Sequence, residues 1–291
     1  MARTYRRYVR PFSDRFTPRG PRLLATRRFT DSGGLVRLPR GTRVWKARYG
    51  PIRGVWIQAR HASSRNGLLV HLHGGGFVFG SARSHRGMAY ALSSASGMPT
   101  FLPEYRLAPR HPFPAAADDC LAAYRALIDH NVTGGRIRLS GDSAGGHLVC
   151  GLLGDIRRHG LPMPAATALF SPMLDLRCTE VVERDLACDD PFISPSAAFA
   201  SAAAYAGTTP LDDPRLDVLN ADKAEWPRTL IQTGELECLL GDSERLAKSL
   251  DAAGVACELQ VWPGQMHVFQ AFDFIPESRA AIRYTGDFLR G

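Results

Sequence analysis

The sequence predicts an α/β fold in which helices flank a mostly parallel central sheet. From about residue 53 onward, short runs of β-branched residues alternate with longer helical stretches, which is typical of such a sheet. Several of the runs are apolar throughout, as strands buried on both faces are. With 291 residues, of which 45% are hydrophobic and 22% charged, the chain is long enough for one substantial core. We therefore expect a single main domain that carries additions.

Strand and helix candidates follow one another in the order that this fold requires. The expected strands are Val55–Ala59, Leu68–Leu72, Ile137–Ser140, Ala166–Phe170, Thr229–Thr233 and Glu258–Trp262. The expected helices are Ala115–Ile128, Ala144–Arg158, Asp242–Ala253 and Glu277–Leu289. Gly134, Gly160 and Gly254 follow three of these helices and suit turns or helix stops.

One stretch, residues 186–221, does not fit the alternation, although it lies between two expected strands. Ser194 as N-cap and Pro195 in the first helical position predict a helix that reaches Tyr205. We expect this stretch and the N-terminal arm to form a cap, and the alternative is an ordinary surface excursion. The predicted division is a core of residues 46–185 and 222–291 and a cap region of residues 1–45 and 186–221.

Positive charge is concentrated in the N-terminal arm. Residues 1–48 hold 14 Lys/Arg against two Asp/Glu, whereas the other 243 residues hold 22 Lys/Arg and 26 Asp/Glu. Prolines interrupt the arm and it carries no nucleic-acid motif, so we expect a solvated basic surface and no nucleic-acid partner. Five apolar residues of the arm are expected to anchor it to the core: Phe12, Phe16, Leu23, Leu24 and Phe29.

The six cysteines are scattered and include no C-x-x-C pair. This pattern favours free thiols in a reducing cytoplasm over a disulfide framework. No apolar run approaches the roughly 18 residues of a membrane span, and no secretory or twin-arginine signal is recognisable. We expect a cytoplasmic protein without stable membrane insertion; a homodimer is the alternative to a monomer, because the sequence does not set the oligomeric state.

The motif Gly141-Asp142-Ser143-Ala144-Gly145 matches G-x-S-x-G. It follows an expected strand and precedes an expected helix, which is the context of a nucleophile elbow. Small residues flank the serine because the backbone turns sharply there. Ser143 is therefore the candidate nucleophile, and we expect Asp142 to hold the elbow in place.

A second motif, His73-Gly74-Gly75-Gly76-Phe77, comes directly after the strand Leu68–Leu72. Consecutive glycines allow backbone N–H groups to face a pocket and stabilise a developing oxyanion. We expect Gly74 and Gly75 to donate these N–H groups together with Ala144, and His73 to hold the loop through a backbone hydrogen bond. His71 and His73 share a strand face, but no third ligand stands at metal spacing, so we expect no metal and no cofactor.

These motifs resemble those of the hormone-sensitive-lipase-like branch of the α/β-hydrolases, the bacterial carboxylesterase type with a GDSAG motif. The resemblance extends from about residue 50 to the C-terminus and implies an esterase of short acyl chains with an α-helical cap. The segments that carry it are His73–Gly76, Glu104–Pro109, Pro112–Ala116 and Gly141–Gly146.

The remaining partners of the serine should follow in the order acid, then histidine. His267 is the one histidine far enough downstream, and the resemblance implies the same residue as general base. The resemblance also places Glu237 where the family commonly has its catalytic Asp. Asp242 is the rival acid, although it equally suits the N-cap of the helix that we expect to begin there.

Together these features predict a serine carboxylesterase that hydrolyses short-chain esters through an acyl-enzyme. The alternatives are a lactonase, amidase or peptidase with the same chemistry, or a non-catalytic ligand-binding relative. We expect a small-molecule ester as the partner. Five residues are candidate walls of its pocket: Phe77, Phe79, Phe192, Ile193 and Met266.

Overall fold

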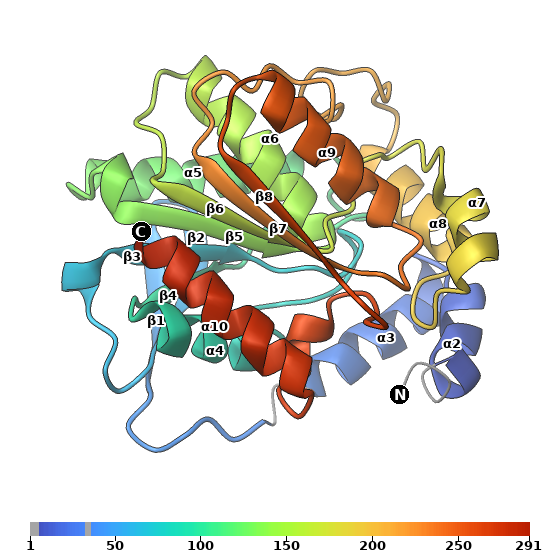
Figure 1. Ribbon diagram of the computed structural model, residues 1–291, viewed down its shortest axis with the longest axis horizontal. Coiled ribbons are helices and arrows are strands. Elements are labelled where there is room, and N and C mark those ends of the chain that lie inside the picture. The colour runs from blue at the N-terminus through green and yellow to red at the C-terminus, as the bar shows by residue number, and fades with distance from the viewer. Residues whose placement is uncertain (1–5, 33–35) are drawn as a thin grey trace.

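The computed structural model describes residues 6–32 and 36–291 of the chain. An eight-stranded sheet in the order β1-β2-β4-β3-β5-β6-β7-β8 forms its centre (Figure 1). β2 pairs antiparallel with β1 and with β4, and the pairs from β4 to β8 are parallel. The strands are β1 (Arg43–Tyr49), β2 (Ile52–Gln58), β3 (Leu68–Leu72), β4 (Thr100–Pro103), β5 (Ile137–Asp142), β6 (Ala166–Phe170), β7 (Arg228–Gly234) and β8 (Cys257–Trp262).

All six expected strands are present, and two are bounded as predicted, Leu68–Leu72 and Ala166–Phe170. β1 and β4 were not predicted from the sequence. β1 is an edge strand whose side chains are mostly exposed, and β4 has only four residues, so neither gives a strong hydrophobic pattern.

Helices cover both faces of the sheet (Figure 1). α4 and α10 pack together on one face, where they bury alternate strand residues such as Leu69 and Leu230. α5, α6 and α9 cover the other face, where Val70 and Ile231 point. The bounds are α4 (Arg86–Ser96), α5 (Ala115–Asp129), α6 (Ala144–Arg158), α9 (Leu240–Ala252) and α10 (Pro276–Arg290). The four expected helices are confirmed, whereas α4 was not predicted.

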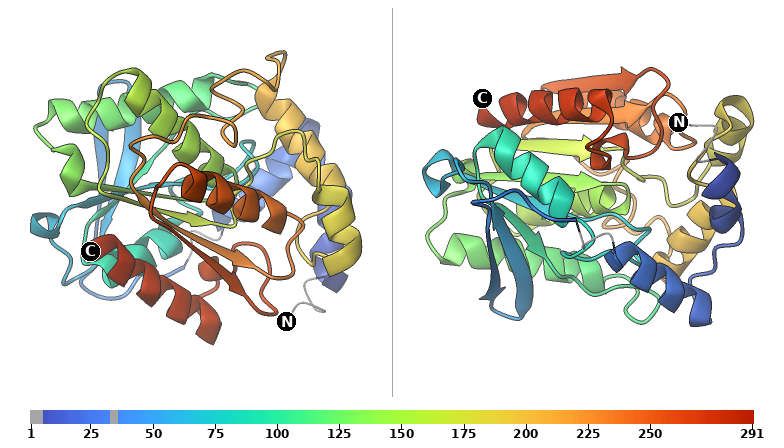
Figure 2. Two further views of the ribbon diagram at one scale, coloured as in Figure 1. Left: turned by 45° about the horizontal axis from the view of Figure 1, so that its top comes forward. Right: turned by 90° about the horizontal axis from the view of Figure 1, so that it is seen from below.

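Four further helices gather beyond the carboxyl ends of the parallel strands (Figure 2). They are α2 (Arg10–Asp14), α3 (Gly20–Ser32), α7 (Val181–Cys188) and α8 (Pro195–Ala206). The predicted start of α8 is confirmed, because the Ser194 side chain accepts a hydrogen bond from Ala197 N at 3.2 Å and Pro195 is the first helical residue. α7 was not predicted.

The N-terminal arm contacts the core through fewer anchors than expected. Leu23 is buried and Phe16 packs against the main core. The prediction is wrong for Phe12, Leu24 and Phe29, which are 79%, 56% and 79% exposed. Periodicity explains the error for Leu24 and Phe29, because the neighbouring positions around Leu23 supply the inward face of α3. Residues 1–5 and 33–35 of the arm lie outside the described residues.

No helix among the described residues is long and apolar enough to cross a membrane. All six cysteines are free thiols, and four of them are buried. The described residues contain no group of three or more His, Cys, Asp or Glu side chains that could hold a metal ion.

Candidate functional site

Ser143 occupies a sharp turn between β5 and α6. Its φ of 52° and ψ of −122° place a non-glycine residue in a conformation that costs energy. The small neighbours are required by space: a Cβ at Gly141 would meet the carbonyl oxygen of Gly145, and a Cβ at Gly145 would meet that of Leu72. The small neighbours therefore allow the backbone to turn sharply at Ser143. Ser143 lines a cavity at this turn.

The structure brings His267 and Glu237 into direct contact. His267 Nδ1 lies 2.8 Å from Glu237 Oε2, and both side chains are almost fully buried. Burial alone would lower the pKa of His267, but the hydrogen bond and the charge of Glu237 outweigh it and raise the pKa above its ordinary value. Glu237 can thus fix the imidazole tautomer and stabilise its protonated form. His267 lines the same cavity as Ser143.

The second oxygen of Glu237 is held in a cage of donors. Oε1 accepts hydrogen bonds from Ser171 Oγ at 2.7 Å, from Thr233 Oγ1 at 3.2 Å and from Gly234 N. Ser171 also accepts a hydrogen bond from Val268 N at 3.0 Å, so one hydroxyl ties the carboxylate to the histidine loop. Ser171 was not predicted from the sequence, because it belongs to no motif and is separated by 66 residues from Glu237 and by 97 residues from Val268.

Asp242 faces a different part of the molecule. Its Oδ2 accepts from Leu174 N at 2.7 Å and Asp175 N at 2.9 Å, and its Oδ1 accepts from Arg245 at 2.9 Å. The expectation of an N-cap is wrong, because α9 begins at Leu240 and Asp242 lies inside its first turn without capping it. The carboxylate instead fixes the loop that follows β6.

The glycine loop presents different N–H groups from those expected. Gly74 N donates to Asp142 Oδ1 at 3.0 Å, so it is not available to an oxyanion, contrary to the sequence expectation. Gly75 and Gly76 have φ values of 115° and 56° and both line the cavity. Within the described part of the chain, no acceptor takes the N–H of Gly75 or Gly76. His73 contacts Gly74 O at 2.8 Å, as expected for a residue that shapes the loop.

Asp142 sits among three histidines beneath this loop. It contacts His71 at 3.1 Å and His85 at 3.5 Å. Burial acts to raise the pKa of Asp142, but the two imidazoles outweigh burial and hold it well below its usual range. Burial lowers the pKa of His71 and of His73, the latter to about 3. Asp142 therefore stays ionised and keeps its hydrogen bond to Gly74, as expected of a residue that fixes the elbow.

A cavity of about 330 Å³ joins these groups to the helices beyond the sheet. Residues of α2, α3 and α8 supply part of its wall, among them Phe12, Thr26 and Ala198. Of the expected wall residues, Phe79, Phe192 and Ile193 line the cavity. Phe77 and Met266 do not: both are buried, and Phe77 stacks on Tyr205 in the core.

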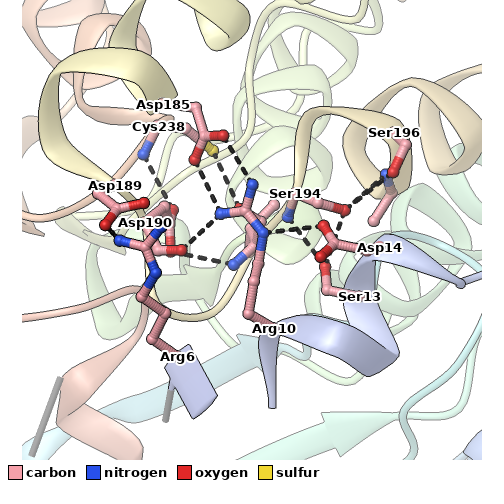
Figure 3. A network of polar contacts seen from close by, with 12 residues as sticks. Arg6, Arg10, Ser13, Asp14, Asp185, Asp189, Asp190, Ser194, Ser196 and Cys238 are labelled. Carbon is pink, nitrogen blue, oxygen red and sulfur yellow. Dashed lines mark hydrogen bonds and ion pairs between the residues drawn. The ribbon is translucent and has the colours of Figure 1, made fainter. Parts of the chain in front are cut away.

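Arg10 fastens α2 to α7 and to the cap loop, residues 189–194, that follows α7 (Figure 3). Its guanidinium donates to both oxygens of Asp185, at 2.8 and 2.6 Å, and to Ile193 O at 3.0 Å. The same loop is tied to the acid loop, because Asp190 Oδ2 accepts from Cys238 N at 2.9 Å. Hydrogen bonds therefore connect the N-terminal arm, the cap loop and the residue next to Glu237.

The family model for the alpha/beta hydrolase fold matches residues 69–271. An acetyl-hydrolase of Streptomyces hygroscopicus is 33% identical over 271 residues, which cover 93% of this chain and 89% of that protein. The human hormone-sensitive lipase is 34% identical over 167 residues, 56% of this chain and 16% of that protein.

Solved structures of similar proteins share the whole architecture. The crystal structure of an esterase from the bacterial hormone-sensitive lipase family superposes with a TM-score of 0.91 and 35% identity. The match covers 99% of this chain and 97% of that one. The arm and cap helices are therefore included in the similarity along with the sheet.

Proposed function

Since the chain belongs to the α/β-hydrolase family, in its hormone-sensitive-lipase-like branch, and is a carboxylic ester hydrolase, we propose that Ser143 attacks short-chain esters to form an acyl-enzyme. The observation that carries this proposal is the His267–Glu237 hydrogen bond in the cavity that the elbow serine lines. The reaction class needs no metal or organic cofactor, because nucleophile, base and oxyanion donors are all protein groups.

In this mechanism His267 removes the Ser143 proton as the hydroxyl attacks the carbonyl carbon. Glu237 holds the imidazole with Nδ1 protonated and stabilises the imidazolium that forms. His267 then gives the proton to the leaving alcohol, and water enters by the same steps to release the acid. Each half-reaction returns the histidine to its neutral form.

The oxyanion is bound by the backbone N–H groups of Gly75, Gly76 and Ala144. The free N–H groups of the two glycines support this set, and Ala144 supplies the donor that follows the nucleophile. Gly74 has a supporting role, because its bond to the Asp142 carboxylate fixes the start of the loop. Preorganised donors of this kind stabilise developing charge without reorganisation.

The domain division is proposed as predicted, with a catalytic core of residues 46–185 and 222–291 and a cap of residues 1–45 and 186–221. It is supported by the cavity, whose lining comes from both parts. The volume of about 330 Å³ lies at the small end for ligand sites, which favours short acyl chains. The free cysteines support a cytoplasmic location.

The test is hydrolysis of p-nitrophenyl esters from acetate to palmitate by the wild type, Ser143→Ala and Glu237→Gln. We expect activity on the short esters that is abolished in Ser143→Ala and strongly reduced in Glu237→Gln. A serine-directed organophosphate should label the wild type at Ser143, detected by peptide mass spectrometry. Wild-type hydrolysis without labelling, or undiminished activity of Ser143→Ala, contradicts the proposal.

A further inference from the structure

Most of the exposed large apolar side chains lie in or beside a few neighbouring elements. Thirteen large apolar residues of the described chain are exposed, and eight of them lie in or beside the cap helices and the loop that follows η4 (Phe269–Ala271). Phe12 is 79% exposed and also lines the cavity, so this apolar surface reaches the entrance. Apolar side chains exposed together on neighbouring elements are typical of an interaction surface.

The orientation of α3 fixes which of its residues face outward. Leu23 is buried, and Arg27 donates to Val78 O at 2.8 Å and Ala108 O at 3.0 Å, so these positions form the inward face. On a 3.6-residue helix Leu24 lies at the flank of this inward face, and Arg28 and Phe29 lie further round the helix toward solvent. All three are exposed, so α3 presents apolar and basic side chains together to solvent.

The arm also exposes arginine side chains. Arg15, Arg22 and Arg28 are exposed, and none of them forms an ion pair with a carboxylate of the described residues. The nearby Asp14 is already bonded to Arg10 at 3.0 Å. We define the arm face by six residues: Phe12, Leu24, Phe29, Arg15, Arg22 and Arg28.

We propose that the arm face docks on an anionic lipid surface. Aromatic and aliphatic side chains enter the boundary between headgroups and acyl chains, while guanidinium groups bind lipid phosphates. A second copy of the chain fits less well, because the same unpaired arginines would face one another across a two-fold contact. Charge complementarity therefore favours an anionic lipid surface over a second copy of the chain as the partner of the arm face.

Docking in this way brings the cavity entrance to the lipid layer. Phe12 belongs to both the arm face and the cavity wall, so an ester dissolved in the layer can enter without crossing water. The choice of lipid-dissolved esters as substrates rests on the proposed function, whereas the docking itself does not depend on catalysis.

The experiment is co-sedimentation of the full chain, carrying Ser143→Ala, with phosphatidylcholine vesicles that contain or lack phosphatidylglycerol. The catalytic serine is removed so that binding is read separately from hydrolysis. We compare Leu24→Ser/Phe29→Ser and Arg22→Gln/Arg28→Gln in this background. Matched controls are Val44→Ser and Arg65→Gln, which change an exposed apolar and an exposed basic residue away from the arm face. Thermal unfolding checks that each variant is folded.

We expect binding to the anionic vesicles that weakens as salt rises. Because each basic residue near an anionic surface contributes about fivefold in partitioning, the double arginine variant should bind about 25-fold more weakly. The apolar double variant should lose binding as well, and both controls should bind like the parent. Equal binding to neutral and anionic vesicles, no binding at all, or arm-face variants that bind like the parent overturns the proposal. A dimer that the arm-face variants abolish, seen by light scattering, also overturns it.

Discussion

Replacing Arg10 by Met should release α2 from α7 and the loop that follows it, and should impair substrate binding. The side chains of Arg10 and Asp185 are 16% and 15% exposed, and they form two short hydrogen bonds. Met keeps much of the side-chain volume but leaves the Asp185 carboxylate largely buried without its partner. α2 and its neighbours contribute Val9, Phe12 and Ser13 to the cavity wall.

The magnitude follows from the burial of this ion pair. Removing one partner of a fully buried pair costs about 3–5 kcal/mol, whereas exposed pairs contribute about 0–1 kcal/mol. For the partial exposure of Arg10, we expect the docking of α2 to weaken by about 2–3 kcal/mol, on the order of 30- to 150-fold in the docked-to-released ratio. Global unfolding should change less, because the α2 contacts are a small part of the whole structure.

Two measurements test this expectation. Steady-state kinetics should show KM for p-nitrophenyl esters rising more than kcat falls, since the catalytic groups stay in place. Limited proteolysis should cut the arm of Arg10→Met much faster than that of Arg15→Met, the matched control, because Arg15 is exposed and makes no ion pair with a described carboxylate. Equal kinetics and equal proteolysis in the two variants would show that the Arg10 contacts do not hold α2 in place.

Three further outcomes follow from the site. The neutral form of His267 is the active base, and its pKa is raised, so kcat/KM should increase with pH through a midpoint above about 6.5, the ordinary histidine value. In Glu237→Gln that midpoint should move to lower pH and the plateau should fall by about 10³-fold or more; an unmoved midpoint contradicts the pairing. Asp242→Asn should lower thermal stability but leave the midpoint unchanged, and the reverse result would make Asp242 the acid. Gly75→Ala should lower kcat by about 10²-fold or more, because φ is 115° and the added Cβ meets Phe79 O; wild-type kcat would exclude the loop from oxyanion binding.

Six of the eight strands could be predicted because buried parallel strands leave strong apolar runs in the sequence. The elbow could be predicted for a similar reason, since its small residues are demanded by local backbone contacts. α4 was not predicted because the strand that follows it, β4, has only four residues and gives no strong apolar run to mark where the helix ends. α7 was missed because it has only eight residues, of which three are charged and just one, Val181, is buried, so the apolar pattern is too short to indicate a helix.

The choice among the three loop glycines could not be made from the sequence. All three have the same chemistry, and which N–H faces the nucleophile depends on where Asp142 reaches across from β5. Ser171 was missed for a related reason: its role exists only where three separate loops converge. Glu237 could be placed by resemblance, but its bond to His267 needed the fold to bring positions 30 residues apart together.

The hydrogen bonds of Arg10 affect when α2 can dock while the chain is being synthesised. The partners of Arg10 in α7 and in the cap loop lie 175 to 183 residues further along the chain. While the ribosome is still making the strands up to β6, α2 emerges without the partners of Arg10, and it can dock on them only after α7 and the loop that follows it have been translated. Contacts so distant in sequence are slow to form. α2, which lines part of the cavity, should therefore be among the last elements to dock. A nascent chain should have a complete cavity wall only late in its synthesis.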